Sequence, residues 1–71
     1  MIELTRQREA FEWSRRELGQ RASLHPARVG QIENQRVRPY PPELERLARA
    51  LGYRGPAEDL VREVEVNAPP A

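Results

Sequence analysis

The spacing of two short helical segments constrains the fold of this chain more than any other feature of its sequence. Ser14 and Glu17 have the three-residue spacing of a capping box, so we expect a helix from Ser14 to about Ala22. Pro26, a residue favoured at the first position of a helix, predicts the start of a second helix that runs to about Asn34. Two such helices joined by a turn of about three residues predict a helix-turn-helix unit.

Further helices are expected on both sides of this unit. Before it, Leu4, Ala10 and Phe11 lie near one face of a helix that ends at about Phe11. After it, a helix is expected to start near Pro42 and to stop at Gly52, because glycine favours a left-handed C-terminal cap. The apolar stripe of that helix has the helical period and consists of Leu44, Leu47, Ala48 and Leu51.

A short fifth helix, expected over Ala57 to Val64, completes the predicted architecture. The fold class is therefore all-α, a compact five-helix bundle with the helix-turn-helix at its second and third helices. We expect a domain over residues 1–55, the short C-terminal helix within residues 56–66, and a flexible tail over residues 67–71. The apolar residues near that end either form a dimer contact or cover the monomer's own core, and they are Leu60, Val61, Val64 and Val66.

The arginines are unevenly distributed along the chain. The net charge is +1, but residues 1–40 hold eight arginines against five acidic residues, whereas residues 41–71 hold four against six. This asymmetry suits a half that faces a polyanion, although it also suits an ordinary solvated surface. All 12 basic residues are arginine. Arginine binds phosphate and guanine bidentately, and the alternative explanation is the coding bias of a GC-rich genome.

Several classes of protein are excluded by what the sequence lacks. The chain has no cysteine, so it has no disulfide framework and no thiolate metal site. No second ligand accompanies the single histidine, and we expect neither a metal nor a cofactor. No apolar run is long enough to span a membrane, and the start shows no signal-peptide pattern. A glycine-rich phosphate loop and a paired set of carboxylates are also missing, so we do not expect an enzyme.

A set of residues between Leu4 and Gly52 matches a single sequence pattern in the same order, without insertions or deletions. The set consists of Arg8, Trp13-Ser14, Glu17-Leu18, Val29, Ile32-Glu33-Asn34, Pro39, Pro41, Leu44, Leu47-Ala48 and Ala50-Leu51-Gly52. This pattern resembles the Cro/C1-type helix-turn-helix proteins, also called the XRE family. The resemblance implies a lambda-repressor-like DNA-binding domain in a cytoplasmic, nucleoid-associated protein.

The resemblance also has departures, one of which is Gln7 in the first helix, where an apolar residue is common in the family. The family usually has alanine at Gly19, and it usually has glycine at Ser23 and at Gln35. The chain must therefore leave its third helix without the usual glycine. Either Asn34 or Gln35 is expected to adopt the left-handed conformation there, and asparagine tolerates it well. Gly30 is unusual inside a helix, and it either permits close approach to DNA or a neighbouring helix or reflects drift at an exposed site.

The function implied by the resemblance is that of a sequence-specific, double-stranded DNA-binding transcriptional regulator. A repressor of the phage or prophage Cro/C1-like kind is the expected mode, acting at an operator. A domain this small covers about half a site, so a homodimer on two half-sites is expected. The alternative is an antitoxin-type module that binds a protein partner through residues 57–71 as well as its operator.

Four residues of the expected recognition helix are candidates for reading bases. Arg28 and Gln31 lie one turn apart on one face, and their side chains can bond guanine and adenine bidentately. The alternatives are phosphate contact for Arg28 and a solvated face for both. Pro26 and Ala27 match positions at which the family reads bases, and they can touch thymine methyl groups. Alternatively, Pro26 only starts the helix.

Phosphate contacts are expected from residues that flank the recognition helix, namely Arg15, His25, Asn34, Arg36 and Arg38. His25 is alternatively a surface or helix-start residue. Arg8 and Glu33 match a family pair that bonds the first helix to the end of the third, which implies a structural role. The alternative is two unrelated surface charges. The expected core residues are Trp13, Leu18, Val29, Ile32, Leu44, Leu47 and Leu51.

Overall fold

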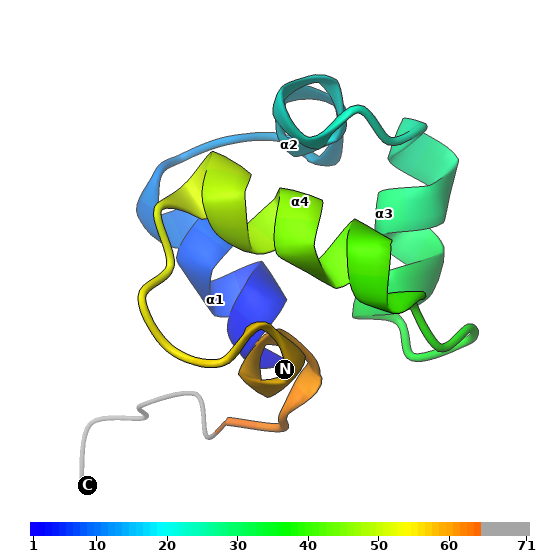
Figure 1. Cartoon of the computed structure of the whole chain (residues 1–71). Coiled ribbons are helices and arrows are strands. Elements are labelled where there is room, and N and C mark those ends of the chain that lie inside the picture. The colour runs from blue at the N-terminus through cyan, green and yellow to red at the C-terminus, as the bar shows by residue number, and fades with distance from the viewer. Residues whose placement is uncertain (65–71) are drawn as a thin grey trace, which may run out of the picture.

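The computed structural model describes residues 1–64, and helices dominate this part of the chain (Figure 1). In chain order the elements are α1 (Glu3–Ala10), α2 (Arg15–Ala22), α3 (Pro26–Glu33), α4 (Pro41–Leu51) and the 3₁₀-helix η1 (Ala57–Val61). Within the described residues the only strand-like feature is one isolated antiparallel bridge between Ile2 and Glu63. The all-α fold class is thereby confirmed.

The prediction of a fifth helix over Ala57 to Val64 is wrong in its length and type. Only a 3₁₀-helix of five residues forms, and the backbone at Arg62 is already extended, with φ −75° and ψ 137°. The segment after η1 pairs with the N-terminal segment instead of continuing the helix. Glu3 donates its amide to the Arg62 carbonyl at 2.9 Å, and Val64 donates its amide to the Met1 carbonyl at 2.8 Å. Val66 and the tail expected over residues 67–71 lie outside the described residues.

The core lies where α4 packs against α2 and η1 (Figure 1). Its apolar members are at most 5% exposed, and they are Ile2, Leu4, Leu18, Ala22, Val29, Ile32, Leu47, Leu51 and Leu60. Two of the expected core residues, Trp13 and Leu44, are only partly buried. Ala10 and Phe11 were expected on the inner face of the first helix, but both are exposed. Phe11 stacks on the Trp13 ring instead, with 4.4 Å between the ring centroids.

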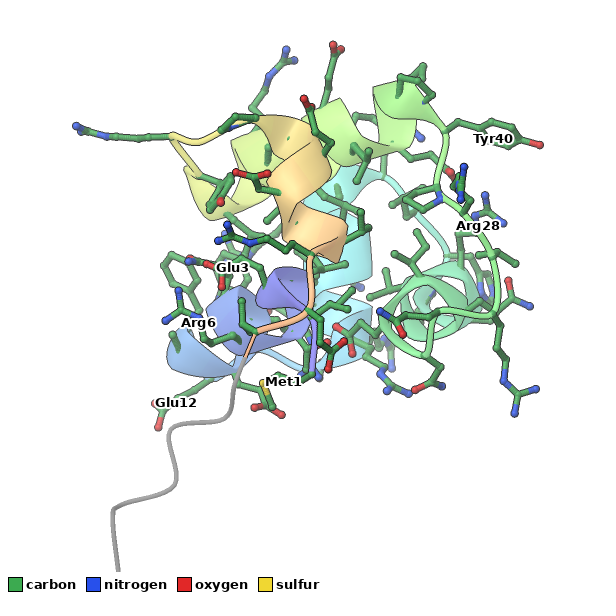
Figure 2. All side chains as sticks on the ribbon, turned by 90° about the horizontal axis from the view of Figure 1, so that it is seen from below. Met1, Glu3, Arg6, Glu12, Arg28 and Tyr40 are labelled. Atoms are coloured by element: carbon green, nitrogen blue, oxygen red, sulfur yellow. The ribbon has the colours of Figure 1, made fainter. Side chains whose placement is uncertain are left out.

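Glu3 is a buried acid at the start of α1. Both of its carboxylate oxygens accept from Arg6, each at 2.6 Å, and one also accepts from Gln7 at 3.0 Å. Figure 2 shows the Glu3 and Arg6 side chains close to each other on the α1 side of the molecule. These hydrogen bonds, chiefly those from Arg6, hold the pKa of Glu3 below its ordinary value.

The two helices of the helix-turn-helix unit start with different caps. Ser14 Oγ accepts from the Glu17 amide at 3.0 Å, which is half of the expected capping box. The other half is wrong, because the Glu17 carboxylate accepts from Arg21 at 3.1 Å instead. His25 caps α3, and its Nδ1 accepts from the Ala27 amide at 3.0 Å. The histidine therefore satisfies an amide that has no partner within its own helix.

The turn between α2 and α3 depends on a close backbone contact. A Cβ on Gly19 would lie 2.5 Å from the carbonyl oxygen of Leu24, so this position requires glycine. Ser23, in the turn, has the left-handed φ of 58°, and so does Gln35 after α3. Asn34 keeps a φ of −84°, so Gln35 is the residue that leaves α3 in the left-handed conformation.

Candidate nucleic-acid interface

The outer face of α3 is the surface that the helix-turn-helix unit presents. Val29 and Ile32 are fully buried, and they fix the orientation of the helix against the core. On the opposite side Ala27 and Gln31 are exposed, while Pro26 is partly buried at the helix start. Two of the four expected base-reading side chains therefore lie open to solvent on one face, one helical turn apart.

Arg28, the fourth of these residues, is held by an acid of α4. Its Nε donates to Glu43 Oε2 at 2.9 Å, and its Nη2 donates to Glu43 Oε1 at 2.8 Å. Its guanidinium also lies over the Tyr40 ring, 5.6 Å from the ring centroid. The side chain remains only 25% exposed. Hydrogen bonding to Glu43 raises the pKa of Arg28, and the same bonds lower the pKa of Glu43.

Glu33, at the C-terminal end of α3, joins three helices. Its side chain is 1% exposed and accepts from Arg8 Nε at 2.7 Å and Arg8 Nη2 at 3.1 Å. Arg8 Nη1 donates to the Trp13 carbonyl at 2.8 Å, which ties in the loop between α1 and α2. Arg15 Nε donates to the same carboxylate at 2.9 Å. The structure thus brings Arg8 and Glu33 together and adds Arg15 to them.

Gly30 leaves space for this arginine. A Cβ at residue 30 would lie 3.3 Å from Arg15 Nη1 and 3.7 Å from its Cδ. The neighbour that explains the glycine is therefore the Arg15 side chain from α2, and residue 30 is buried rather than exposed. Arg15 crosses the surface of α3 with its side chain 45% exposed, so its outer part faces solvent beside the recognition helix.

The remaining expected phosphate contacts surround α3. His25 is exposed at its start, and Asn34, Arg36 and Arg38 are exposed in and after its C-terminal cap. Arg36 and Arg38 also line a shallow groove, together with Ile32, Val37 and Val61. The loop between α3 and α4 therefore carries two solvent-facing guanidinium groups next to the recognition helix.

Sequence reasoning missed two groups of residues. Tyr40 and Glu43 were not expected at this surface, although Glu43 stands at the third position of α4, where an acid often caps a helix. A second basic groove between α2 and α4 was also missed. Its lining includes Arg21, Arg46 and Arg49, and Arg46 Nε donates to the Ala22 carbonyl at 3.1 Å. Arginine spacing along α4 was the only available signal for it.

The fold and this surface define a helix-turn-helix domain with an exposed recognition helix, a class of protein that binds DNA. The chain belongs to a family of helix-turn-helix domains, and the family match covers residues 2–63. The expected family is thereby confirmed, and the match is consistent with a Cro/C1-type protein. Neither a curated protein nor a solved structure matches the chain. None of the helices within residues 1–64 has the length and apolar character that a membrane crossing requires.

Proposed function

We propose that this protein binds a specific double-stranded DNA operator through α3 and regulates transcription there as a repressor of the Cro/C1-like kind. The observation that carries the proposal is the exposed face of α3 with arginines beside it and in the loop that follows it. Arg15 lies beside the helix on the α2 side, and Arg36 and Arg38 follow it. Helix α3 then enters the major groove, and α2 crosses the phosphate backbone.

Sequence preference in this arrangement comes from the outer face of α3. The Gln31 amide is suited to adenine, since its oxygen and nitrogen match the N6 and N7 groups of that base. The Arg28 guanidinium is suited to guanine O6 and N7. Ala27 and Pro26 have no side-chain donor, and they suit the methyl group of thymine.

Affinity in this arrangement comes from contacts to the phosphates. Arg36 and Arg38 reach the backbone from the loop after α3, and Arg15 reaches it from α2. His25 and Asn34 add contacts at the two ends of the helix. Such contacts set the position of the protein on the duplex and make binding depend on salt, but they do not distinguish sequences.

A homodimer on two half-sites is part of the proposal. A two-fold dimer reads two half-sites about one helical turn of DNA apart, which doubles the contacted sequence. Leu60 is fully buried in the core of its own subunit. Among the described residues, the dimer contact is therefore left to the partly buried Val61 and Val64.

The experiment that tests the proposal selects binding sites from random duplex DNA with the purified protein. The expected result is an enriched, roughly palindromic site for which the logarithm of the affinity falls linearly with the logarithm of the salt concentration. Gln31→Ala is expected to relax the preference at one position of each half-site, and Arg54→Ala, at an exposed site outside this surface, is the matched control. Weak binding shared by all sequences would reject the proposal and favour a module that binds a protein partner.

A further inference from the structure

Glu43 makes two different sets of hydrogen bonds at the edge of the α3 surface. Its carboxylate accepts from Arg28 Nε and Nη2, at 2.9 Å and 2.8 Å. The Oε1 atom also accepts from the Tyr40 amide at 2.8 Å, which caps the start of α4. Figure 2 shows Arg28 and Tyr40 on the same side of the molecule, where α3 and the start of α4 meet. Glu43 is therefore fixed by its own helix while it holds a side chain of the recognition helix.

The guanidinium group has a second edge that Glu43 does not occupy. A guanidinium carries five N–H donors in a rigid plane. Glu43 takes the side edge, formed by Nε and one hydrogen of Nη2. The end edge, formed by Nη1 and the other hydrogen of Nη2, has no acceptor among residues 1–64. Two parallel N–H groups of this kind match the O6 and N7 acceptors of guanine.

The charge of the pair argues against a phosphate as the ligand of this edge. The Glu43 carboxylate neutralises the Arg28 guanidinium, so the pair contributes little net attraction to a polyanion. A phosphate bound to the end edge would also lie close to the carboxylate and be repelled by it. Neutral acceptors on a base carry no such penalty. The cation–π contact with Tyr40 and two bonds to Glu43 further restrict the rotamers of Arg28, which favours directional recognition.

We propose that Glu43 is a positioning residue that aims the end edge of Arg28 at a guanine and keeps this arginine from acting as a general phosphate contact. This inference rests on the proposed binding of operator DNA by α3. It assigns to Glu43 a role in sequence preference, although the residue itself touches no DNA.

The test compares Glu43→Gln with the matched variant Glu45→Gln. Glutamine at 43 can still accept from the Tyr40 amide, but it cannot accept both Arg28 bonds. Glu45 is exposed on the same helix and loses the same charge. Each variant is titrated with the selected duplex, with that duplex altered at single guanines, and with a random duplex, over a range of salt concentrations.

Glu43→Gln is expected to lower the preference for one guanine about tenfold. It is also expected to tighten binding to the random duplex and to steepen the salt dependence by about one phosphate contact. Glu45→Gln should keep the guanine preference. Arg28→Lys is a second variant that keeps the charge but lacks the planar guanidinium group needed for bidentate bonding, and it should lose the same preference.

The results separate this inference from the proposed function. An unchanged guanine preference in a folded Glu43→Gln protein, or in Arg28→Lys, would overturn the role of Glu43 while operator binding stands. If the wild-type protein enriches no site at all, both proposals are wrong. Thermal melting followed by circular dichroism establishes that the variants are folded.

Discussion

Arg15 of α2 lies across Gly30 of α3, with its Nη1 atom 3.3 Å from the point that a Cβ of residue 30 would occupy. Its Nε atom is bonded to the buried Glu33 carboxylate at 2.9 Å. The side chain is therefore anchored at its middle and open at its end. In this way a carboxylate near the C-terminal end of α3 holds the guanidinium for which we propose a phosphate contact beside that same helix.

Removing the negative charge of Glu33 is expected to destabilise the protein. Glu33→Gln leaves Arg8 and Arg15 without their shared acid, and Arg8 is only 13% exposed. Breaking a buried ion pair from one side typically lowers the free energy of unfolding by about 3 kcal/mol. Urea denaturation measures this loss. Glu17→Gln, which breaks the exposed pair with Arg21, is the control and should change stability by less than about 1 kcal/mol. Equal losses in both variants would contradict the burial argument.

The two helical glycines are expected to respond oppositely to alanine. Gly19→Ala places a methyl group 2.5 Å from the rigid Leu24 carbonyl, and overpacking of this kind lowers stability by about 1–3 kcal/mol. Gly30→Ala places a methyl group 3.3 Å from Arg15 Nη1, the solvent-facing end of a side chain that can shift by a few tenths of an ångström. The gain in helix propensity should therefore prevail, at about 0.5–1 kcal/mol. Thermal unfolding of both variants decides the matter. A stabilised Gly19→Ala protein would mean that the turn relaxes freely.

The left-handed residue after α3 is expected to be a site of stabilisation. Gln35 has a φ of 58°, a left-handed conformation that is unfavourable for residues with a Cβ atom and that glycine adopts freely. Gln35→Gly should therefore raise the free energy of unfolding by about 0.5 kcal/mol, after the greater entropy of unfolded glycine is subtracted. Asn34→Gly is the control, because Asn34 has a φ of −84° and gains nothing from glycine. Chemical denaturation of the pair tests the difference, which should vanish if the loop adapts.

Stability is expected to fall in acid because of Glu3 and Glu43. Hydrogen bonds from Arg6 and Arg28, respectively, lower the pKa of each carboxyl from its ordinary value of 4.5. A carboxyl group whose pKa is lower in the folded state stabilises the protein at every pH above its unfolded-state pKa. This stabilisation is lost as the pH falls below about 4.5 toward the folded-state pKa. Unfolding by urea from pH 7 down to pH 2 measures the loss. Glu3→Gln should flatten the curve, whereas Glu58→Gln, at an exposed site, should leave its shape unchanged.

The loop after α3 is expected to contribute to salt dependence but not to sequence preference. Arg36→Ala should reduce the slope of log affinity against log salt by about 0.9, the value for one phosphate contact. The preference among bases should stay the same, because phosphate contacts carry no sequence information. Fluorescence anisotropy with the selected duplex and a random duplex measures both quantities. An altered base preference would instead place Arg36 in a groove.

The parts of this structure that could be predicted from sequence are those with local signals. Pro26 starts α3 as expected, and Gly52 ends α4 with a left-handed φ of 65°. The extent of η1 could not be predicted, because the chain after Val61 follows hydrogen bonds to the N-terminal segment rather than a pattern of its own. The prediction that Phe11 lies on the inner face of α1 was wrong, because the helix ends before this residue and the Phe11 ring stacks on Trp13.

The same distinction applies to the candidate site. The exposure of Ala27 and Gln31 follows from the apolar period of α3, which a single helix reveals. The bond between Arg28 and Glu43 joins residues 15 positions apart on two helices. It depends on how α4 crosses α3, and no local pattern encodes that crossing. Candidate base-reading residues can therefore be placed by periodicity, but the residues that contact them from other helices require the packing of the whole domain.

The pairing of Ile2 with Glu63 joins segments from opposite ends of the described chain. Closing so long a loop carries a larger loss of chain entropy than closing the short turn between α2 and α3. We therefore expect this contact to form late in folding. The α2–α3 unit has contacts between neighbours in sequence in addition to its longer-range bonds to Arg8 and Glu43. Because Ile2 and Leu60 belong to the same core as Val29 and Ile32 of α3, closing the two ends of the domain completes the packing on which the orientation of α3 depends.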